Sequence, residues 1–391
     1  MSPEQLAKDQ HRRLVLVDTG SGLWGGQRYA MQLIDYLRAS DFDVVIAAQA
    51  GSALGEWWES TGGKVLLLPG RHRPERVRFD DARKVFLVIR QALALRHYVK
   101  RTKTDVLLSN SNWDHPTVAL TGATRGISSI LILHEESRAP LIRSFSSRLA
   151  SQSIAVSSRV AATISGPGKK KTRVVHNGVD TVRFQPGATD PETRSLLSEN
   201  PDGVIVGCIG RIDQSKQIED VVHAVSALPP EVADSVTLVC VGSTSNDPHY
   251  EQEILLLGNA FLHSRFRHLP ARDDIDRLLK NVDIAVFAGS REGMSLAMLE
   301  AMSSGCAVVA YVAAGVEEVI VNDISGIIIP MGDESGMTRA IASLVAAPEL
   351  RKRMGAAAQE RVRQRFDLEA RAGDVVAIIK DVLRNKSTTT S

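Results

Sequence analysis

The sequence predicts an α/β protein of two domains, each built on a parallel sheet covered by helices. Three observations predict this class. The 391 residues are long for one domain and ordinary for two. Short apolar runs alternate with helical patterns, which is typical of parallel strands joined by helices. The alternation starts twice, at Leu14–Val17 and again at Val204–Ile209.

Changes in this pattern set the expected boundaries. Residues 1–180 are predicted to form the first domain and residues 181–367 the second. Residues 368–391 are predicted to form a final helix and a tail. Neither the first twelve residues nor the last six show a periodic pattern, so we expect both ends to be disordered.

Composition is that of an ordinary globular protein, with 43% hydrophobic and 24% charged residues. Cys208, Cys240 and Cys306 lie in apolar surroundings without the spacing of metal ligands, which indicates reduced thiols and no metal site. No apolar run reaches the length of a membrane span, and the first residues lack the apolar core of a signal peptide. We therefore expect a cytoplasmic protein.

Charge is distributed unevenly between the halves. Residues 1–180 carry 26 Lys and Arg against 16 Asp and Glu, whereas residues 181–391 carry 21 against 29. Much of the excess lies in residues 71–103, where Val85–Val99 predicts a helix with its apolar face on the sheet. Such a basic stretch is more often a solvated face, although it can also attract an anionic acceptor or membrane. Its aromatic residues are not interleaved in a way that suggests nucleic acid, so we expect no nucleic acid partner.

A glycine-rich loop follows the first strand. Gly20, Gly22 and Gly25 have the spacing of a dinucleotide-binding fingerprint. That fingerprint expects an acid at the end of the second strand, where this sequence has Gln49; Asp43 comes too early. The match alone is weak evidence for an NAD-dependent oxidoreductase, and a plain tight turn between strand and helix is the alternative.

A histidine follows a later strand of the same half. Ile130–Leu133 predicts a buried strand, and His134 comes directly after it. Ligands of open α/β sheets bind at the carboxyl ends of the strands, so His134 is a candidate site residue. A structural histidine with satisfied hydrogen bonds is an equally ordinary reading.

Two cations follow the first strand of the second half. Gly210 and Arg211 come directly after Val204–Ile209, and Lys216 lies five residues beyond Arg211. Arginine can bridge two phosphate oxygens and lysine supplies a point charge, so the pair suits a pyrophosphate. The alternative is two surface cations near a turn.

Residues 282–319 read as strand, loop, helix and strand. Glu292 lies in the loop and Glu300 lies in the apolar helix predicted at Leu296–Met302. Such a helix tolerates a charge only when it is paired or bound to a ligand. Small residues at the helix start leave backbone N–H groups open to an anion. A phosphate-bearing ligand held between two carboxylates would use these features, although each acid could also be an ordinary surface residue.

Together these motifs resemble the retaining glycosyltransferases of family 4, the glycogen-synthase-like enzymes of GT-B fold. Glu292 and Glu300 match the two acids of the E-x7-E signature of that family. Arg211 and Lys216 match its G-R-x-x-x-x-K element. Gln217 departs from the pattern, since the family usually has glycine after the lysine.

The resemblance implies an architecture and a set of ligands. It implies two Rossmann-like domains facing across a cleft, with a C-terminal helix that crosses back to the first domain. A nucleotide-diphosphate-sugar donor would bind mainly to the second domain and a hydroxyl acceptor to the first. No cofactor other than this donor substrate is implied.

The resemblance also assigns roles to the charged residues. Arg211 and Lys216 would hold the donor diphosphate and stabilise charge on the leaving group. Glu292 would orient the donor sugar and Glu300 would contact the ribose. His134 would lie beside the anomeric centre.

Backbone groups complete the implied site. The loop at Gly25 and Gly26 resembles the family's glycine loop, which approaches the donor diphosphate and the acceptor. The start of the helix near Glu300 would offer backbone N–H groups from Gly293, Met294, Ser295 and Leu296.

The predicted reaction is transfer of a sugar from a nucleotide-sugar to a hydroxyl, with retention at the anomeric carbon and without a metal, in the synthesis of a polysaccharide, glycolipid or other glycoconjugate. The basic first half suggests a phosphorylated or lipid-linked acceptor and contact with the inner face of a membrane. Pro270 stands where the family often has glycine and removes an N–H donor, so the base is left open. The alternatives are a nucleotide-sugar epimerase or a phosphorylase of related fold, an NAD-dependent oxidoreductase, and a sugar-nucleotide-binding protein without turnover.

Overall fold

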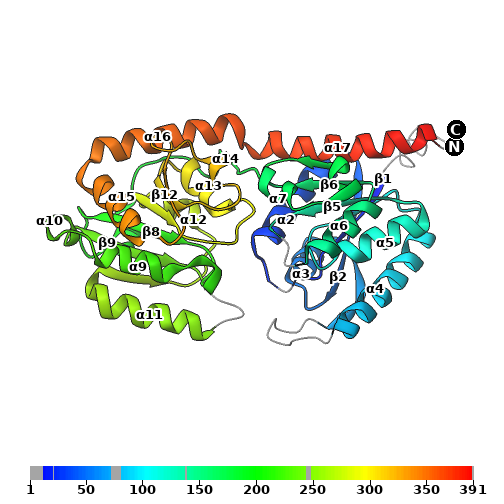
Figure 1. Cartoon of the computed structure of the whole chain (residues 1–391), viewed down its shortest axis with the longest axis horizontal. Coiled ribbons are helices and arrows are strands. Elements are labelled where there is room, and N and C mark those ends of the chain that lie inside the picture. Colours follow the sequence, from blue (N-terminus) through cyan, green and yellow to red (C-terminus); the bar gives the residue numbers. More distant parts are fainter. Residues whose placement is uncertain (1–11, 21, 72–80, 137–138, 244–247, 390–391) are drawn as a thin grey trace. The chain divides into compact units, whose positions relative to one another are not determined.

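A computed structural model describes residues 12–20, 22–71, 81–136, 139–243 and 248–389 of the chain. The chain divides into two units, coloured along the sequence in Figure 1. Unit 1 holds the residues up to His176 together with those from Glu369 onward, and unit 2 holds Asn177–Leu368. Each unit is a parallel sheet packed with helices, which confirms the predicted fold class.

Unit 1 contains a seven-stranded parallel sheet with the order β3-β2-β1-β4-β5-β6-β7. Its strands are β1 (Arg12–Val17), β2 (Phe42–Ala50), β3 (Lys64–Arg71), β4 (Val106–Ser109), β5 (Ser128–Leu133), β6 (Gln152–Ala155) and β7 (Thr172–Val174). The chain runs outward from β1 in both directions, so the order reverses between β1 and β4. Ligands of open α/β sheets bind at such a switch point, beyond the carboxyl ends of the strands.

The helices of unit 1 connect these strands. They are α2 (Gly25–Ala39), α3 (Ala53–Ser60), α4 (Asp81–Thr102), α5 (His115–Arg125), α6 (Pro140–Leu149), α7 (Ser158–Ala162) and α17 (Leu368–Thr389). Apart from its first residue, α17 belongs to unit 1, where Arg173 and Asp381 form an ion pair with a 3.8 Å N–O distance. Helix α2 begins at Gly25, so Gly25 and Gly26 of the predicted glycine loop both lie in its first turn.

The apolar face of α4 is divided between the protein interior and its surface. Leu95 and Val99 are buried, as predicted. Phe86, Ile89 and Leu93 are exposed, with 61%, 46% and 61% of their surface accessible. The expectation that the apolar face packs on the sheet is therefore wrong for these three residues, because the helix carries more apolar residues than one contact face can cover.

Unit 2 repeats the arrangement of unit 1 with six parallel strands in the order β10-β9-β8-β11-β12-β13. They are β8 (Val204–Ile209), β9 (Val236–Val241), β10 (Phe266–Leu269), β11 (Ile284–Phe287), β12 (Ala307–Tyr311) and β13 (Ile327–Ile329). The order reverses between β8 and β11. The loops after these two strands are those in which the sequence places Arg211, Lys216 and Glu292.

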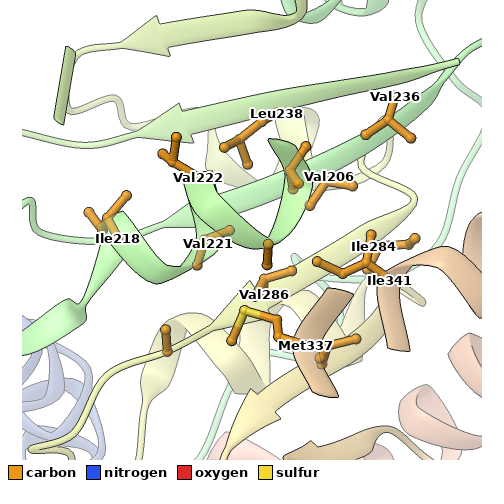
Figure 2. Close-up of a cluster of buried hydrophobic side chains, with 14 of the residues drawn as sticks. Val206, Ile218, Val221, Val222, Val236, Leu238, Ile284, Val286, Met337 and Ile341 are labelled. Carbon is orange, nitrogen blue, oxygen red and sulfur yellow. The ribbon is translucent and has the colours of Figure 1, made fainter. Parts of the chain in front are cut away.

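Helices of unit 2 cover this sheet (Figure 1). They are α8 (Pro191–Leu197), α9 (Ile218–Ser226), α10 (Pro230–Ala233), α11 (Pro248–Leu262), α12 (Ile275–Leu279), α13 (Leu296–Ser303), α14 (Val316–Val319), α15 (Glu334–Ala346) and α16 (Pro348–Arg365). Figure 2 shows the core beneath α9, where Val221 and Val222 lie among side chains of β8 and β9. Met337 and Ile341 of α15 belong to the same cluster. This packing fixes the start of α9 and with it the end of the loop that carries Lys216.

The segment after β7 already belongs to unit 2. Asn177 Nδ2 donates a hydrogen bond to Met294 O at 2.9 Å. Val179 N donates to Phe366 O, and Leu368 N donates to Val179 O, each at 2.9 Å. These contacts place the division after His176, four residues before the predicted end of the first domain at residue 180.

Candidate functional site

Two loops meet at the switch point of the unit 2 sheet. The loop after β8 runs from Gly210 to Gln217, and the loop after β11 runs from Ala288 to Ser295. Ser290 N donates a hydrogen bond to Ser215 O at 2.9 Å, which ties one loop to the other. The structure therefore brings the predicted cationic element and the first predicted acid into one place.

Lys216 and Glu292 form an ion pair across these loops. Their side chains keep 23% and 21% of their surface exposed, so solvent and ligands can reach the pair. Gly289 leaves room for it, because a Cβ at this position would lie 3.3 Å from Glu292 Oε1 and 3.5 Å from Lys216 Cδ. A diphosphate that enters here would compete with Glu292 for the lysine.

Burial lowers the pKa of Lys216 to about 8, and the positive charge of Arg211 acts in the same direction. Asp213 opposes this shift. The ion pair with Glu292 also favours the charged form, so we expect Lys216 to be protonated at neutral pH. A partly buried cation that is held close to another cation attracts an anion strongly.

Arg211 lies at the open side of the loop after β8. Its Nη1 is 3.2 Å from Asp213 Oδ2, and 41% of its side-chain surface is exposed. Asp213 Oδ1 accepts a hydrogen bond from Ser215 N at 3.0 Å and so begins the short 3₁₀ turn that leads to Lys216. The loop thus presents the exposed guanidinium of Arg211 and the paired ammonium of Lys216 at one edge of the sheet.

Gln217 adopts the left-handed conformation, with φ 48° and ψ 47°. Glycine takes this conformation freely, whereas other residues pay for the contact between Cβ and backbone. Gln217, which replaces the glycine usual in the family, therefore forms the same left-handed turn but with backbone strain. Gln217 Oε1 is buried without a hydrogen-bond partner among the described residues.

The start of α13 lies next to the Glu292 loop. Ser295 caps this helix, and its Oγ accepts a hydrogen bond from Met298 N at 3.3 Å. The first N–H groups of a helix have no acceptor within it, so they can bind an anion. Gly315 packs against this segment, where a Cβ would lie only 2.5 Å from Gly293 O. The backbone of Gly293, Met294, Ser295 and Leu296 is thus held in place from a second loop.

Glu300 lies within α13, with only 8% of its surface exposed. The structure thus confirms the buried setting that the apolar neighbours indicate. The contact between Glu300 and a ribose stays a prediction.

The second group of polar residues lies at the switch point of unit 1. Asp18 follows β1, Asn110 follows β4 and His134 follows β5. Asn110 Nδ2 donates hydrogen bonds to Asp18 Oδ2 at 2.6 Å and to Gly26 O at 2.9 Å. Asn110 Oδ1 lies 2.9 Å from His134 Nε2. The predicted residues Gly26 and His134 are therefore joined through Asn110.

His134 is partly exposed, and its ring packs edge-on against Tyr29 with 4.9 Å between the ring centroids. Burial of the ring and the nearby Arg143 guanidinium lower the pKa of His134 to about 4. The imidazole is therefore neutral at physiological pH. Gly25 has no atom within 4 Å of where its Cβ would lie, whereas a Cβ on Gly26 would lie 3.6 Å from His134 Cδ2.

Asp18 and Asn110 are not among the predicted site residues. Both are buried, with 0% and 1% of their surface exposed. A signal for them is present in the sequence, because each comes directly after a buried strand. The information that β1 and β4 are neighbours at the switch point was missing, and it requires the strand order.

Other features of the described residues bear on the remaining expectations. Within the part of the chain that the structure describes, no group of three or more His, Cys, Asp or Glu side chains is placed to hold a metal ion. No described helix is both long and apolar enough to cross a membrane. The three cysteines are free thiols. A cavity of about 420 Å³ in unit 1 is lined by Ser128 and Gln152, at the amino ends of β5 and β6, and contains no predicted site residue.

Comparison with known protein families covers both halves of the chain. Residues 24–183 match the model of the family "Glycosyltransferase Family 4". Residues 190–361 match the model of "Glycosyl transferases group 1". The two matches follow one another along the chain.

Curated relatives show the same likeness over part of their length. A lipopolysaccharide core biosynthesis mannosyltransferase of Rhizobium leguminosarum bv. viciae is 30% identical over 54% of this chain and 60% of its own length. The N-acetyl-alpha-D-glucosaminyl L-malate synthase of Bacillus anthracis is 28% identical over 55% of each chain. The matches thus span somewhat more than half the length of these relatives.

Solved structures share the fold over nearly the whole chain. The Anabaena protein HepE, crystallised with UDP and glucose, has a TM-score of 0.79 and 18% identity, with 95% of this chain and 100% of that chain covered. A glycosyltransferase from Rickettsia africae has a TM-score of 0.80 and 18% identity, with 96% and 100% covered. Both family models and this shared fold identify the chain as a member of the family 4-like glycosyltransferases of GT-B fold.

Proposed function

We propose that the protein transfers a sugar from a nucleotide-diphosphate-sugar to a hydroxyl acceptor, with retention of configuration at the anomeric carbon. The observation that carries this proposal is the grouping of Arg211, Lys216 and Glu292 at the switch point of the unit 2 sheet. Two cations and a carboxylate at such a crevice suit a ligand that has both phosphates and sugar hydroxyls.

The ion pair suggests how a donor would use the site. Its diphosphate takes the place of Glu292 at the Lys216 ammonium, and Arg211 turns from Asp213 toward the same phosphates. The carboxylate of Glu292 is then available to accept hydrogen bonds from the sugar hydroxyls. As the bond between the sugar and the diphosphate breaks, charge grows on the leaving group and both cations stabilise it more strongly.

Known relatives support the class of donor. HepE was crystallised with UDP-glucose, and several curated relatives are named as enzymes that transfer or join sugars. UDP-glucose is therefore the first donor to test here, followed by other nucleotide-sugars. Glu300, buried in α13, would contact the ribose, and the N–H groups at the start of that helix would assist the phosphates.

A ligand screen and a turnover assay test the proposal. Thermal unfolding is measured with UDP-glucose, GDP-mannose, their free nucleotides and NAD(P), because a ligand well above its dissociation constant raises the stability by a few kcal/mol. We expect stabilisation by one nucleotide-sugar and its nucleotide, and none by NAD(P). Stabilisation by NAD(P) alone would favour the oxidoreductase. Asp43 argues against that reading, because it lies at the amino end of β2 and pairs with Arg13.

Two variants and a control connect turnover to the site. Lys216→Met and Arg211→Ala should each lower turnover by about 100-fold or more, as expected for groups that stabilise transition-state charge. Lys352→Met changes an exposed lysine on α16 and should keep full turnover. Equal turnover in all three variants would refute the assignment. A product that forms only with an acceptor separates a transferase from an epimerase.

Two further measurements test whether the anomeric configuration is retained and whether turnover needs a metal ion. NMR of the first-formed product gives the configuration at the anomeric carbon, which should equal that of the donor. Protein treated with EDTA should keep its turnover, since the two cations would supply the charge that a metal supplies in other transferases.

Helix α4 favours an acceptor at a membrane surface. Phe86, Ile89 and Leu93 form an exposed apolar stripe at helical spacing, and Arg90 lies over the Phe86 ring at 5.7 Å. Lys100 and Arg101 extend the basic side of the same helix. An exposed apolar stripe with cations on its flanks fits the interface of an anionic bilayer.

Vesicle binding tests this contact. The protein should sediment with vesicles of phosphatidylcholine and phosphatidylglycerol, less with phosphatidylcholine alone, and less again at high salt. Phe86→Ser with Leu93→Ser should weaken binding without a change in the turnover of a soluble acceptor. Binding that ignores both lipid charge and these substitutions would refute the membrane contact and leave a soluble phosphorylated acceptor.

A further inference from the structure

The buried carboxylate of Asp18 is surrounded by hydrogen-bond donors. Gly20 N donates to its Oδ1 at 2.8 Å, and Gln27 Nε2 lies 3.1 Å from Oδ1 and 3.0 Å from Oδ2. Asn110 Nδ2 donates to Oδ2 at 2.6 Å. All three donors come from short segments after β1 and β4 or from the first turn of α2. Asp18 therefore fixes the orientation of the groups that point at it.

This environment fixes the amide of Asn110. One side of the amide faces two acceptors, the Asp18 carboxylate and Gly26 O, so the NH2 group must lie on that side. The amide oxygen must then face His134. If the amide were turned over, its oxygen would meet two other oxygens and both hydrogen bonds would be lost.

The fixed amide determines the tautomer of His134. An amide oxygen only accepts, so the Nε2 atom at 2.9 Å must carry the hydrogen and donate it. The ring is neutral, and Nδ1 is therefore left as a hydrogen-bond acceptor. Among the described residues no side chain or backbone group donates to Nδ1, and the ring keeps part of its surface exposed.

We propose that Asp18 and Asn110 are positioning residues that hold His134 in its Nε2–H tautomer, so that Nδ1 accepts a hydrogen bond from a hydroxyl group of the substrate. The part that concerns the substrate rests on the proposed function, whereas the tautomer does not. Asp18 acts only through Asn110, since it has no contact with the ring. The ring also packs edge-on against Tyr29.

Nitrogen NMR reads the tautomer directly. The full chain is prepared with ¹⁵N-labelled histidine rings, and the His134 signals among those of the ten histidines are assigned by their loss in His134→Gln. Near neutral pH we expect a protonated Nε2 and an unprotonated Nδ1. A protonated Nδ1, with or without a protonated Nε2, would overturn the proposal.

Replacement of the amide by a carboxylate tests the step from Asn110 to His134. Asn110→Asp leaves an acceptor beside Nε2, and its second oxygen faces Asp18 Oδ2, so the two carboxyls share one proton. Part of their negative charge then lies beside the ring, which favours the imidazolium. The titration midpoint of His134 should rise by about 1 to 3 pH units. Asn259→Asp is the control, since it adds the same charge at an exposed position of α11 in unit 2, where Asn259 bonds to Leu255 O. The same midpoint in both variants would contradict direct coupling through residue 110.

Asp18→Asn tests the first step. The new amide turns an NH2 group toward donors that meet a carboxylate oxygen in the wild type, so the amide of Asn110 should lose its fixed orientation. We expect the two ring nitrogen shifts of His134 to move toward each other as both neutral tautomers become populated. Unchanged shifts in a folded Asp18→Asn protein would show that Asp18 does not position Asn110. The effect of Asn110 on His134 is tested by Asn110→Asp, whether or not Asp18→Asn folds.

Turnover separates this inference from the proposed function. If the chain is a transferase, Asn110→Asp should lower kcat by about tenfold or more while the affinity for the free nucleotide stays near that of the wild type, because the nucleotide is proposed to bind unit 2. Absence of any turnover in the wild type would reject the proposed function but leave the NMR result valid. Wild-type kcat in a variant with an altered His134 tautomer would reject the role of Nδ1.

Discussion

Lys216 and Glu292 are 76 positions apart in the sequence and form an ion pair between the loops after β8 and β11. Because β8 and β11 are neighbours in the sheet, the two loops leave it side by side. The pair therefore holds a cation and an anion at the point where a donor would need both. Glu292 is thus an internal anion at the lysine.

Removal of this internal anion should strengthen the binding of a free nucleotide diphosphate. Glu292→Gln leaves Lys216 without its carboxylate partner, so a diphosphate no longer competes for it. Since an ion pair of this exposure contributes up to about 1 kcal/mol, the dissociation constant for UDP or GDP should fall by up to about fivefold. Turnover should fall at the same time, because the glutamine cannot orient the sugar hydroxyls as the carboxylate does.

Titration calorimetry with the nucleotide identified by the ligand screen measures this effect. Glu317→Gln is a suitable control, because Glu317 is an exposed glutamate on α14. Weaker nucleotide binding in Glu292→Gln than in the control would show that Glu292 does not compete for Lys216.

The left-handed conformation of Gln217 predicts a stabilising substitution. Gln217→Gly removes the contact between Cβ and backbone, about 1–2 kcal/mol, against about 0.5–1 kcal/mol for the greater freedom of glycine in the unfolded chain. It also removes the buried amide oxygen that has no partner among the described residues. We expect unit 2 to gain about 0.5–1 kcal/mol in its free energy of unfolding.

Urea unfolding followed by far-UV circular dichroism measures this gain. All four tryptophans, Trp24, Trp57, Trp58 and Trp113, lie in unit 1, so their fluorescence provides an internal reference that should not shift. Gln214→Gly is the control, because Gln214 lies in the same turn without a positive φ and its replacement should cost stability. Equal effects of the two substitutions would mean that the strain is not relieved.

Gly315 should tolerate no side chain. Its φ is 80°, and a Cβ would lie 2.5 Å from Gly293 O and 3.1 Å from Met294 Cα. Gly315→Ala should therefore cost about 2–3 kcal/mol and weaken nucleotide binding by displacing the loop before α13. Gly332 is a control that separates backbone strain from the steric contact, because its φ is 77° and a Cβ there would have nothing within 4 Å.

We expect Gly332→Ala to cost about 1 kcal/mol through backbone strain alone and to leave nucleotide binding unchanged. The two free energies of unfolding and the two dissociation constants are measured side by side. If both variants bind nucleotide as the wild type does, the packing of Gly315 on Gly293 does not hold the site in place.

Sequence patterns predicted strands such as β1, β5 and β8, because each is a short apolar run that ends at a polar or glycine-rich loop. They also located Arg211, Lys216 and Glu292, since these motifs are local. The pairing of Lys216 with Glu292 needed more, namely the order of strands in the sheet. A run of apolar residues shows that a strand is buried, but it does not show which strand lies beside it.

The same limit explains why Asp18 and Asn110 were missed. They are 92 positions apart, and their contact depends on the pairing of β1 with β4, in which Val17 lies opposite Ser109. The exposed stripe of α4 has a different cause. Periodicity marks apolar residues on a helix, but it does not decide which of them the neighbouring elements cover, so Leu93 and Leu95 could not be distinguished.

Unit 1 should lose stability as pH rises through neutrality, because of Asp114. Burial, together with the charge of Asp18, raises the pKa of this carboxyl from 3.8 to about 7. Between these values the folded state holds a proton that the unfolded state has released, so the contribution of Asp114 to stability is complete below about pH 4 and is lost as pH rises toward 7. The largest slope that one such group can give is about 1.4 kcal/mol per pH unit.

Asp114→Asn should remove this slope. Thr19 N donates to Asp114 Oδ2 and Thr19 Oγ1 donates to Oδ1, at 3.0 and 2.7 Å. An asparagine can accept the first hydrogen bond and donate the second to the hydroxyl, so the fold should persist. His115, whose pKa burial lowers to about 3, gives a slope of opposite sign that both proteins share. The difference between variant and wild type therefore isolates Asp114.

Urea unfolding of both proteins from about pH 5 to about pH 8, followed by tryptophan fluorescence, measures this difference. The variant should gain stability relative to the wild type as pH rises, and the gain should level off above the pKa of Asp114. Asp35→Asn, which changes an exposed carboxylate on α2, should follow the wild type at every pH. Parallel curves for Asp114→Asn and the wild type would mean that Asp114 is already ionised in the folded protein at the lowest pH measured.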